Sequence, residues 1–187
     1  MPSVNHPFLQ SPATLEAFVA DWHAHRLTRE AWTHGAHVGV CAYYAFDHDE
    51  AATLAIMRPG IRAFNESIGG QNTATSGYHE SITRLWVMAI SAHLRAHPVG
   101  SRWEAAHSAV DSFGSPHELL HQCYTFDVVA DIRARAEWVP PDRPVPWDYV
   151  RRFTGSQVHG SQVRAATRGC AEAPCPPRGP RVPLARR

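Results

Sequence analysis

The spacing of apolar residues is the feature that most constrains the fold of this chain. Through residues 1–150, large apolar side chains recur three or four positions apart, as in Leu15, Phe18 and Trp22. This spacing places them on one face of an α-helix. No segment shows the sustained two-residue alternation of apolar and polar residues that is typical of a half-buried strand. The sequence therefore predicts an all-α domain, either a helical bundle or an orthogonal array of six to seven helices.

Capping residues, prolines and glycines predict where these helices begin and end. Ser11 stands before a proline and is suited to cap a first helix, and the stretch from Ser115 to Glu118 has the pattern of a capping box. Pro59 and Gly60 interrupt the third helical segment, which predicts a kinked helix or two short ones. The expected helices are 12–22, 28–46, 51–68, 78–97, 101–113, 116–126 and 131–138.

The charge distribution divides the chain into two parts. Residues 1–150 hold ten Arg against sixteen Asp and Glu, a net charge of −6, whereas residues 151–187 hold eight Arg against one Glu, a net charge of +7. The second part is rich in Arg, Gly and Pro and has few aliphatic residues to bury. We therefore expect a helical domain over 1–150 and a disordered basic tail over 151–187. Nucleic acid is an unlikely partner, because the tail lacks interleaved aromatic residues.

Length and composition are those of one soluble globular domain. The chain has 187 residues, of which 44% are hydrophobic. It has no run of about 18 apolar residues that could span a membrane, and its first residues lack the pattern of a secretory signal, so the expected location is cytoplasmic. The four cysteines form no CxxC pair and are expected to be free thiols: Cys41, Cys123, Cys170 and Cys175.

Histidine is unusually frequent, and two segments single out particular imidazoles. The chain has thirteen His, among them His34 and His37 in one predicted helix and His79 at the start of another. Residues three apart lie on one face of a helix, so His34 and His37 can bind one metal ion, with His79 as a third ligand if the two helices pack face to face. His121 is a weaker candidate for a fourth ligand. Three neutral imidazoles suit Zn, Fe, Ni or Cu.

Other polar and aromatic residues near His79 are candidates for catalysis and substrate binding. Glu80 could act as a general acid or base or orient a ligand, and Thr83, one turn after His79, could donate a hydrogen bond. The polar loop 71–77 could line a cavity. The candidates for substrate binding are Tyr78, Trp86, Arg62 and Asn72.

These residues leave more than one function open. The leading hypothesis is a metal-dependent enzyme acting on a small molecule: Zn or Ni would favour hydrolytic or lyase chemistry, and Fe or Cu would favour oxidative chemistry. The alternative is a metal-free protein that binds a small molecule or a partner and whose histidines form a polar core. A third possibility is a metal-free enzyme with His34 or His79 as general base. Any of these could form a homo-oligomer.

One set of motifs resembles a family of small bacterial all-helical proteins of uncharacterised activity. The resemblance covers about residues 15–147 and lies in the segments Trp32–His37, Met57–Arg62, Gly77–Thr83 and Trp138–Asp142. Pro59 and Ser81 depart from the pattern, which favours a residue other than proline and a threonine there. The resemblance supports the choice of His34, His37, His79 and Glu80 and implies no reaction.

Overall fold

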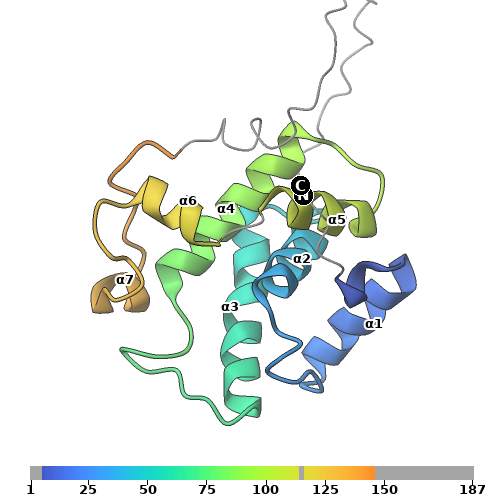
Figure 1. Cartoon of the computed structure of the whole chain (residues 1–187), viewed down its shortest axis with the longest axis horizontal. Coiled ribbons are helices and arrows are strands. Elements are labelled where there is room, and N and C mark those ends of the chain that lie inside the picture. Colours follow the sequence, from blue (N-terminus) through green and yellow to red (C-terminus); the bar gives the residue numbers. More distant parts are fainter. Residues whose placement is uncertain (1–5, 114–115, 146–187) are drawn as a thin grey trace, which may run out of the picture. The chain divides into compact units, whose positions relative to one another are not determined.

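The structure, a computed structural model, describes residues 6–113 and 116–145, and the elements in these ranges are all helical (Figure 1). The prediction of an all-α fold is confirmed. The predicted tail and the predicted cap at Ser115 lie outside the described residues. The elements are η1 (Pro7–Leu9), a 3₁₀-helix, and the α-helices α1 (Pro12–His23), α2 (His34–Ala45), α3 (Glu50–Ser67), α4 (Glu80–Ala96), α5 (Arg102–Ser112), α6 (Pro116–Cys123) and α7 (Ile132–Ala136).

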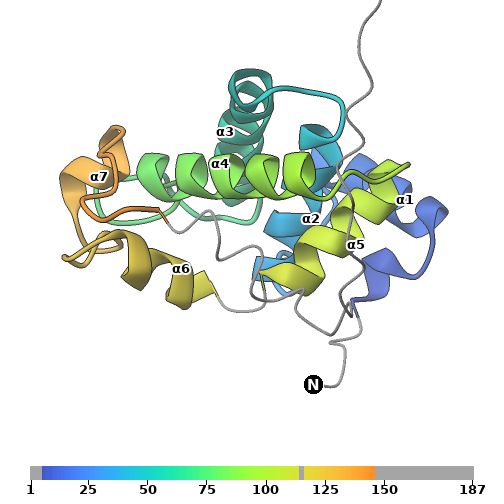
Figure 2. The ribbon, with the colours of Figure 1, turned by 90° about the horizontal axis from the view of Figure 1, so that it is seen from above.

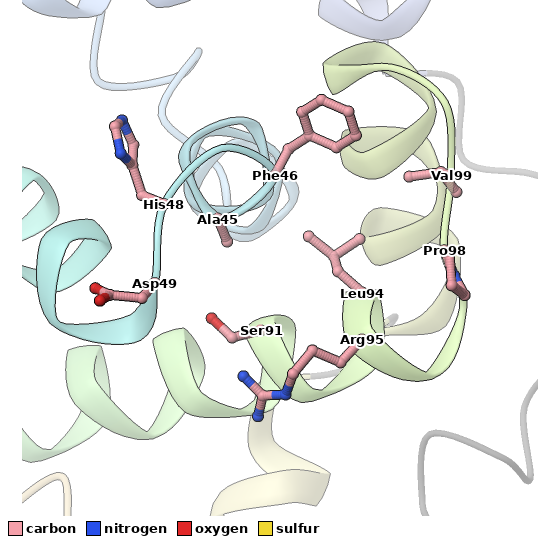
Figure 3. Close-up of a pocket in the computed structure, with 9 residues that line it drawn as sticks. All are labelled: Ala45, Phe46, His48, Asp49, Ser91, Leu94, Arg95, Pro98 and Val99. Atoms are coloured by element: carbon pink, nitrogen blue, oxygen red, sulfur yellow. The ribbon is translucent and has the colours of Figure 1, made fainter. Parts of the chain in front are cut away.

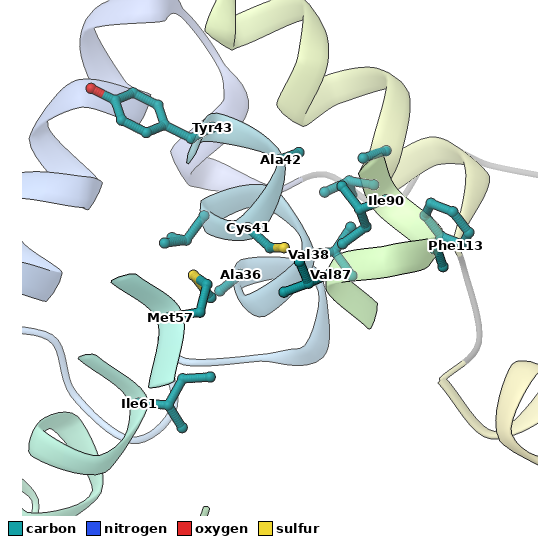
Figure 4. Close-up of a cluster of buried hydrophobic side chains, with 14 of the residues drawn as sticks. Ala36, Val38, Cys41, Ala42, Tyr43, Met57, Ile61, Val87, Ile90 and Phe113 are labelled. Atoms are coloured by element: carbon teal, nitrogen blue, oxygen red, sulfur yellow. The ribbon is translucent and has the colours of Figure 1, made fainter. Parts of the chain in front are cut away.

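Helix α2 is the centre of the packed array. It packs against α3, α4 and α5, and α4 also contacts α7 (Figures 1 and 2). The core lies between these helices, where Val38 and Cys41 of α2 meet Met57 of α3 and Val87 and Ile90 of α4 (Figure 4). Within the described residues, no helix has the length and apolar character needed to cross a membrane.

Helix α2 begins six residues later than predicted. Its N-cap is Thr33, whose side chain accepts a hydrogen bond from the backbone N–H of Ala36 at 3.3 Å. A threonine oxygen in this position satisfies one of the free N–H groups of the first helical turn. Residues 28–33, predicted to be helical, are a turn and a cap instead. His34 is consequently the first residue of the helix rather than a residue of its second turn.

Helix α4 also begins later than predicted, and His79 is its cap. The helix runs over Glu80–Ala96, whereas the predicted range was 78–97. His79 has an extended backbone, and its ring Nδ1 accepts a hydrogen bond from the N–H of Ile82 at 3.3 Å. The imidazole therefore takes the place of the usual Ser, Thr, Asp or Asn at this position.

Helix α3 passes through Pro59 without a break, so the alternative of two short helices is wrong. The proline removes one backbone donor. On both sides of it the helix buries large side chains, Met57, Ile61 and Phe64, which hold it against the core. Gly60 lies against Trp22, because a Cβ atom at Gly60 would stand 2.2 Å from the indole. The glycine thus permits close packing of α3 on α1.

The last two helices are shorter than predicted. Helix α6 ends at Cys123 rather than near residue 126. Helix α7 has five residues and is capped by Asp131, whose carboxylate accepts a hydrogen bond from the N–H of Ala134 at 2.6 Å. Cys41 and Cys123 are buried free thiols, as predicted, and the other two cysteines lie outside the described residues.

Candidate functional site

A cavity of about 390 Å³ lies between α2, α3 and α4 and is closed on one side by residues of α6 and α7. Most of its wall is apolar: Val38, Met57, Ile61, Ile82, Val87 and Ile90. Six of the residues predicted to form a site line this cavity together: His34, His37, Tyr78, His79, Thr83 and Trp86. An apolar cavity with a few polar groups is the usual form of a small-molecule site.

His37 contributes a neutral imidazole with one nitrogen available. Its Nδ1–H donates to the backbone carbonyl of Thr33 at 3.0 Å, which leaves Nε2 as a hydrogen-bond acceptor. Within the described residues, nothing donates to Nε2. Burial lowers the pKa of His37 to about 4, although the hydrogen bond to Thr33 acts in the opposite direction. The ring packs on Trp32, with 4.2 Å between centroids, which fixes its orientation.

His34 lies beside Trp86 on the wall of the same cavity. The two rings meet edge to face at a centroid distance of 5.0 Å and an interplanar angle of 60°. His34 and His37 are both half-buried and stand three residues apart on α2. The structure therefore brings these two imidazoles to one cavity, as the helical spacing predicted.

His79 also lines the cavity, but both of its ring nitrogens are occupied. Nδ1 accepts from the N–H of Ile82 in the cap of α4, and Nε2–H donates to the carbonyl of Val128 at 2.8 Å. Burial lowers the pKa of this imidazole, which favours its neutral form. To bind a metal ion, His79 would have to release one of these two backbone partners.

Glu80 does not line the cavity and forms an ion pair with Arg58, in which the carboxylate is nearly buried and the guanidinium is 41% exposed. Its two oxygens accept from Arg58 Nε at 2.9 Å and Nη2 at 2.5 Å, and one of them also accepts from the Tyr78 hydroxyl at 2.9 Å. The hydrogen bonds from Arg58 hold the pKa of Glu80 below its usual value, while burial raises the pKa of Tyr78 to about 12. This arrangement fixes the start of α4 on α3. A catalytic role for Glu80 stays a prediction, as does one for Thr83.

Asn72 and Arg62 support the loop before α4 and do not line the cavity. Asn72 donates to the carbonyl of Arg62 at 3.0 Å and accepts from the N–H of Tyr78 at 3.0 Å. The guanidinium of Arg62 lies over the Tyr78 ring at 4.5 Å. Gly77 has φ +78°, and a Cβ atom there would stand 2.5 Å from the carbonyl oxygen of Gln71. Residues 71–77 therefore pack closely against one another. Of these residues, only Gly77 lines the cavity.

His121 is exposed on α6 and is not part of the cavity wall, although its neighbour Leu120 is. Across residues 6–113 and 116–145, no three His, Cys, Asp or Glu side chains are grouped so that they could hold one metal ion. The predicted divalent metal and its four ligands stay predictions.

Arg135 of α7 is a cavity residue that the sequence did not reveal. Its guanidinium donates to the carbonyls of Gly77 at 3.1 Å, Tyr78 at 3.3 Å and Val129 at 3.1 Å, so it ties α7 to the loop before α4. No local pattern signals this role, because its partner Gly77 is 58 residues away in the chain. Cys41 also lines the cavity. Its position one turn after His37 on α2 could have indicated this from the sequence, because residues four apart share a helix face.

Comparison of the chain with protein-family models, with curated proteins and with solved structures found no match. The resemblance to the helical bacterial family therefore stays a prediction, and the argument for function depends on the cavity alone.

Proposed function

We propose that this protein binds a small, uncharged and mainly apolar molecule in the cavity between α2, α3 and α4. The observation that carries the proposal is His37, a neutral imidazole with a free acceptor nitrogen on the wall of an otherwise largely apolar cavity. A hydrogen-bond donor of the ligand, such as a hydroxyl group, would fit Nε2. The apolar part of the ligand would lie against the aliphatic wall and Trp86.

The charges around the cavity support an uncharged ligand. The imidazoles of His37 and His79 are held neutral by burial. Among the described residues that line the wall, the only charged one is Arg135, whose guanidinium donates to three backbone carbonyls. Glu80, which follows His79 directly in the sequence, is paired with Arg58 and does not line the cavity. A buried charge on the ligand would therefore lack a dedicated partner, and such burial is costly.

A divalent metal ion, one of Zn, Fe, Ni or Cu, is the second candidate ligand. The observation that favours it is that His34 and His37 line one cavity from successive turns of α2. Elemental analysis of the purified protein and of a His37→Ala variant tests this candidate. Metal near one equivalent that disappears in the variant supports it, and a metal content that does not change in the variant contradicts it.

Blocking the cavity tests the binding proposal. The probe is para-cresol, which has an apolar ring and one hydroxyl group and is uncharged at neutral pH. We expect it to bind the wild-type protein and to shift amide resonances of α2 and α4 in NMR spectra. Ile82→Trp should fill the cavity and weaken binding at least about tenfold, equivalent to about 1.4 kcal/mol.

The matched control is Ile132→Trp, at a residue that is 57% exposed and does not line the cavity. This variant should bind para-cresol as the wild type does. Overpacking at Ile82 costs about 1–3 kcal/mol, so the fold of the variant is checked by its NMR spectrum. Equal binding by both Trp variants would contradict the proposal, as would the absence of binding to the wild-type protein.

A further inference from the structure

A second cavity, of about 380 Å³, lies where the end of α2 and the start of α3 approach the end of α4 (Figure 3). Phe46, Leu94 and Val99 form part of an apolar wall, and Phe46 is 36% exposed. The polar residues of the wall include Asp49, Ser91 and Arg95. None of these six residues lines the first cavity.

Ser91 carries a buried hydroxyl group without a hydrogen-bond partner in the described part of the chain. The residue is 4% exposed, and its Oγ is buried. A helical serine can donate to the carbonyl four residues earlier, but this one does not. The hydroxyl points from α4 toward the end of α2 and the start of α3 (Figure 3). An unpaired buried hydroxyl costs about 1–3 kcal/mol, so a ligand that pairs with it recovers that free energy.

Arg95 and Asp49 place one charge of each sign on the same wall. Arg95 Nη2 donates to Glu50 at 2.9 Å, and within the described residues its other N–H groups have no acceptor. One oxygen of Asp49 caps α3 by accepting from the N–H of Ala52 at 2.8 Å. The other oxygen has no donor among the described residues. Both side chains therefore have free hydrogen-bonding capacity.

We propose that this second cavity binds the zwitterion of an α-amino acid with an apolar side chain. The ligand carboxylate accepts from Ser91 and Arg95, its ammonium group donates to Asp49, and its side chain lies against Phe46 and Leu94. A zwitterion fits because the wall carries both charges. A simple anion would stand near Asp49, and a simple cation would stand near Arg95, each with unfavourable electrostatics. Arginine suits a carboxylate because its N–H groups can form two parallel hydrogen bonds.

Derivatives of one ligand test the proposal. The probes are L-phenylalanine and L-leucine, the methyl ester of phenylalanine, which lacks the carboxylate, and N-acetylphenylalanine, which lacks the ammonium group. We expect the free amino acids to shift the amide resonances of Ser91 and Arg95 in NMR titrations, and each derivative to bind at least about tenfold more weakly. No response to either amino acid at about 10 mM, a concentration that detects weak millimolar binding, overturns the proposal. Equal binding of the ester also overturns it.

Ser91→Ala distinguishes two explanations of the unpaired hydroxyl: that it binds a ligand, or that it is satisfied by a trapped water molecule. The variant should lose amino-acid binding at least about tenfold. Its midpoint of thermal unfolding should equal or exceed that of the wild type without ligand, since an unpaired hydroxyl has been removed. Ser67→Ala, at an exposed position of α3, is the control and should leave binding unchanged. A lower midpoint for Ser91→Ala with unchanged amino-acid binding would overturn the proposal.

Discussion

At the scale of single residues, burial favours the neutral form of the imidazoles of His37, His79 and His93. His93 is fully buried between α4 and α5, where its Nε2 lies 2.7 Å from the Ser108 hydroxyl. Burial lowers the pKa of His93 to about 4, as it does for His37. His97, whose ring lies 4.7 Å away, acts on His93 in the same direction. Protonation of either buried imidazole therefore opposes folding.

The free energy of unfolding should consequently fall as the pH is lowered from about 6.5 to about 4. In this window the unfolded chain, with a histidine pKa near 6.5, binds protons that the folded protein excludes. Each such histidine contributes a slope of up to about 1.4 kcal/mol per pH unit. Urea denaturation at several pH values measures this dependence. His93→Gln should flatten it, while His121→Gln, at an exposed position, should not. Identical slopes in the two variants would contradict the assignment.

At the scale of the elements, the positions at which α2 and α4 begin determine which ring nitrogens of His37 and His79 are already hydrogen-bonded. Apolar spacing predicted both helices and placed His34 and His37 on an inward face. It did not predict that His79 is a cap, because a histidine cap is uncommon and depends on the ring orientation. Nor could it predict the second bond of His79, since Val128 is 49 residues away. Local patterns predict helices well and predict long-range hydrogen bonds poorly.

The packing of α3 on α1 makes a further prediction at this scale. Gly60→Ala should destabilise the protein, although alanine favours a helix by about 1 kcal/mol relative to glycine. The added methyl group would stand 2.2 Å from the Trp22 ring, which is itself buried and cannot move freely. We expect a net cost of about 1–3 kcal/mol in urea denaturation. Gly100→Ala is the control, because the nearest contact of its added methyl group would be the carboxylate of the exposed side chain of Glu104, at 3.3 Å. A variant at Gly60 as stable as the wild type would show that α1 and α3 pack less closely.

At the scale of the whole molecule, the cavity is a product of packing between segments far apart in the chain. The sequence indicated which helix faces point inward, and so six residues of the cavity wall were among the predicted site residues. It could not indicate where inward faces fail to fill the space between them, because that depends on helix crossing and side-chain volume. Glu80, Arg62 and Asn72 were predicted as site residues on the same kind of sequence evidence. They do not line the cavity, and they hold the start of α4 in place.

The most direct test of the account compares two probes that differ in one group. Para-cresol and para-xylene have nearly the same shape, but only para-cresol can donate a hydrogen bond to His37 Nε2. Calorimetric titration of the wild-type protein should show para-cresol binding about 2- to 10-fold more tightly, the effect of one hydrogen bond of about 0.5–1.5 kcal/mol. In His37→Leu this preference should disappear, and in His121→Leu it should remain. A preference for para-cresol that persists in His37→Leu would contradict the central role of His37.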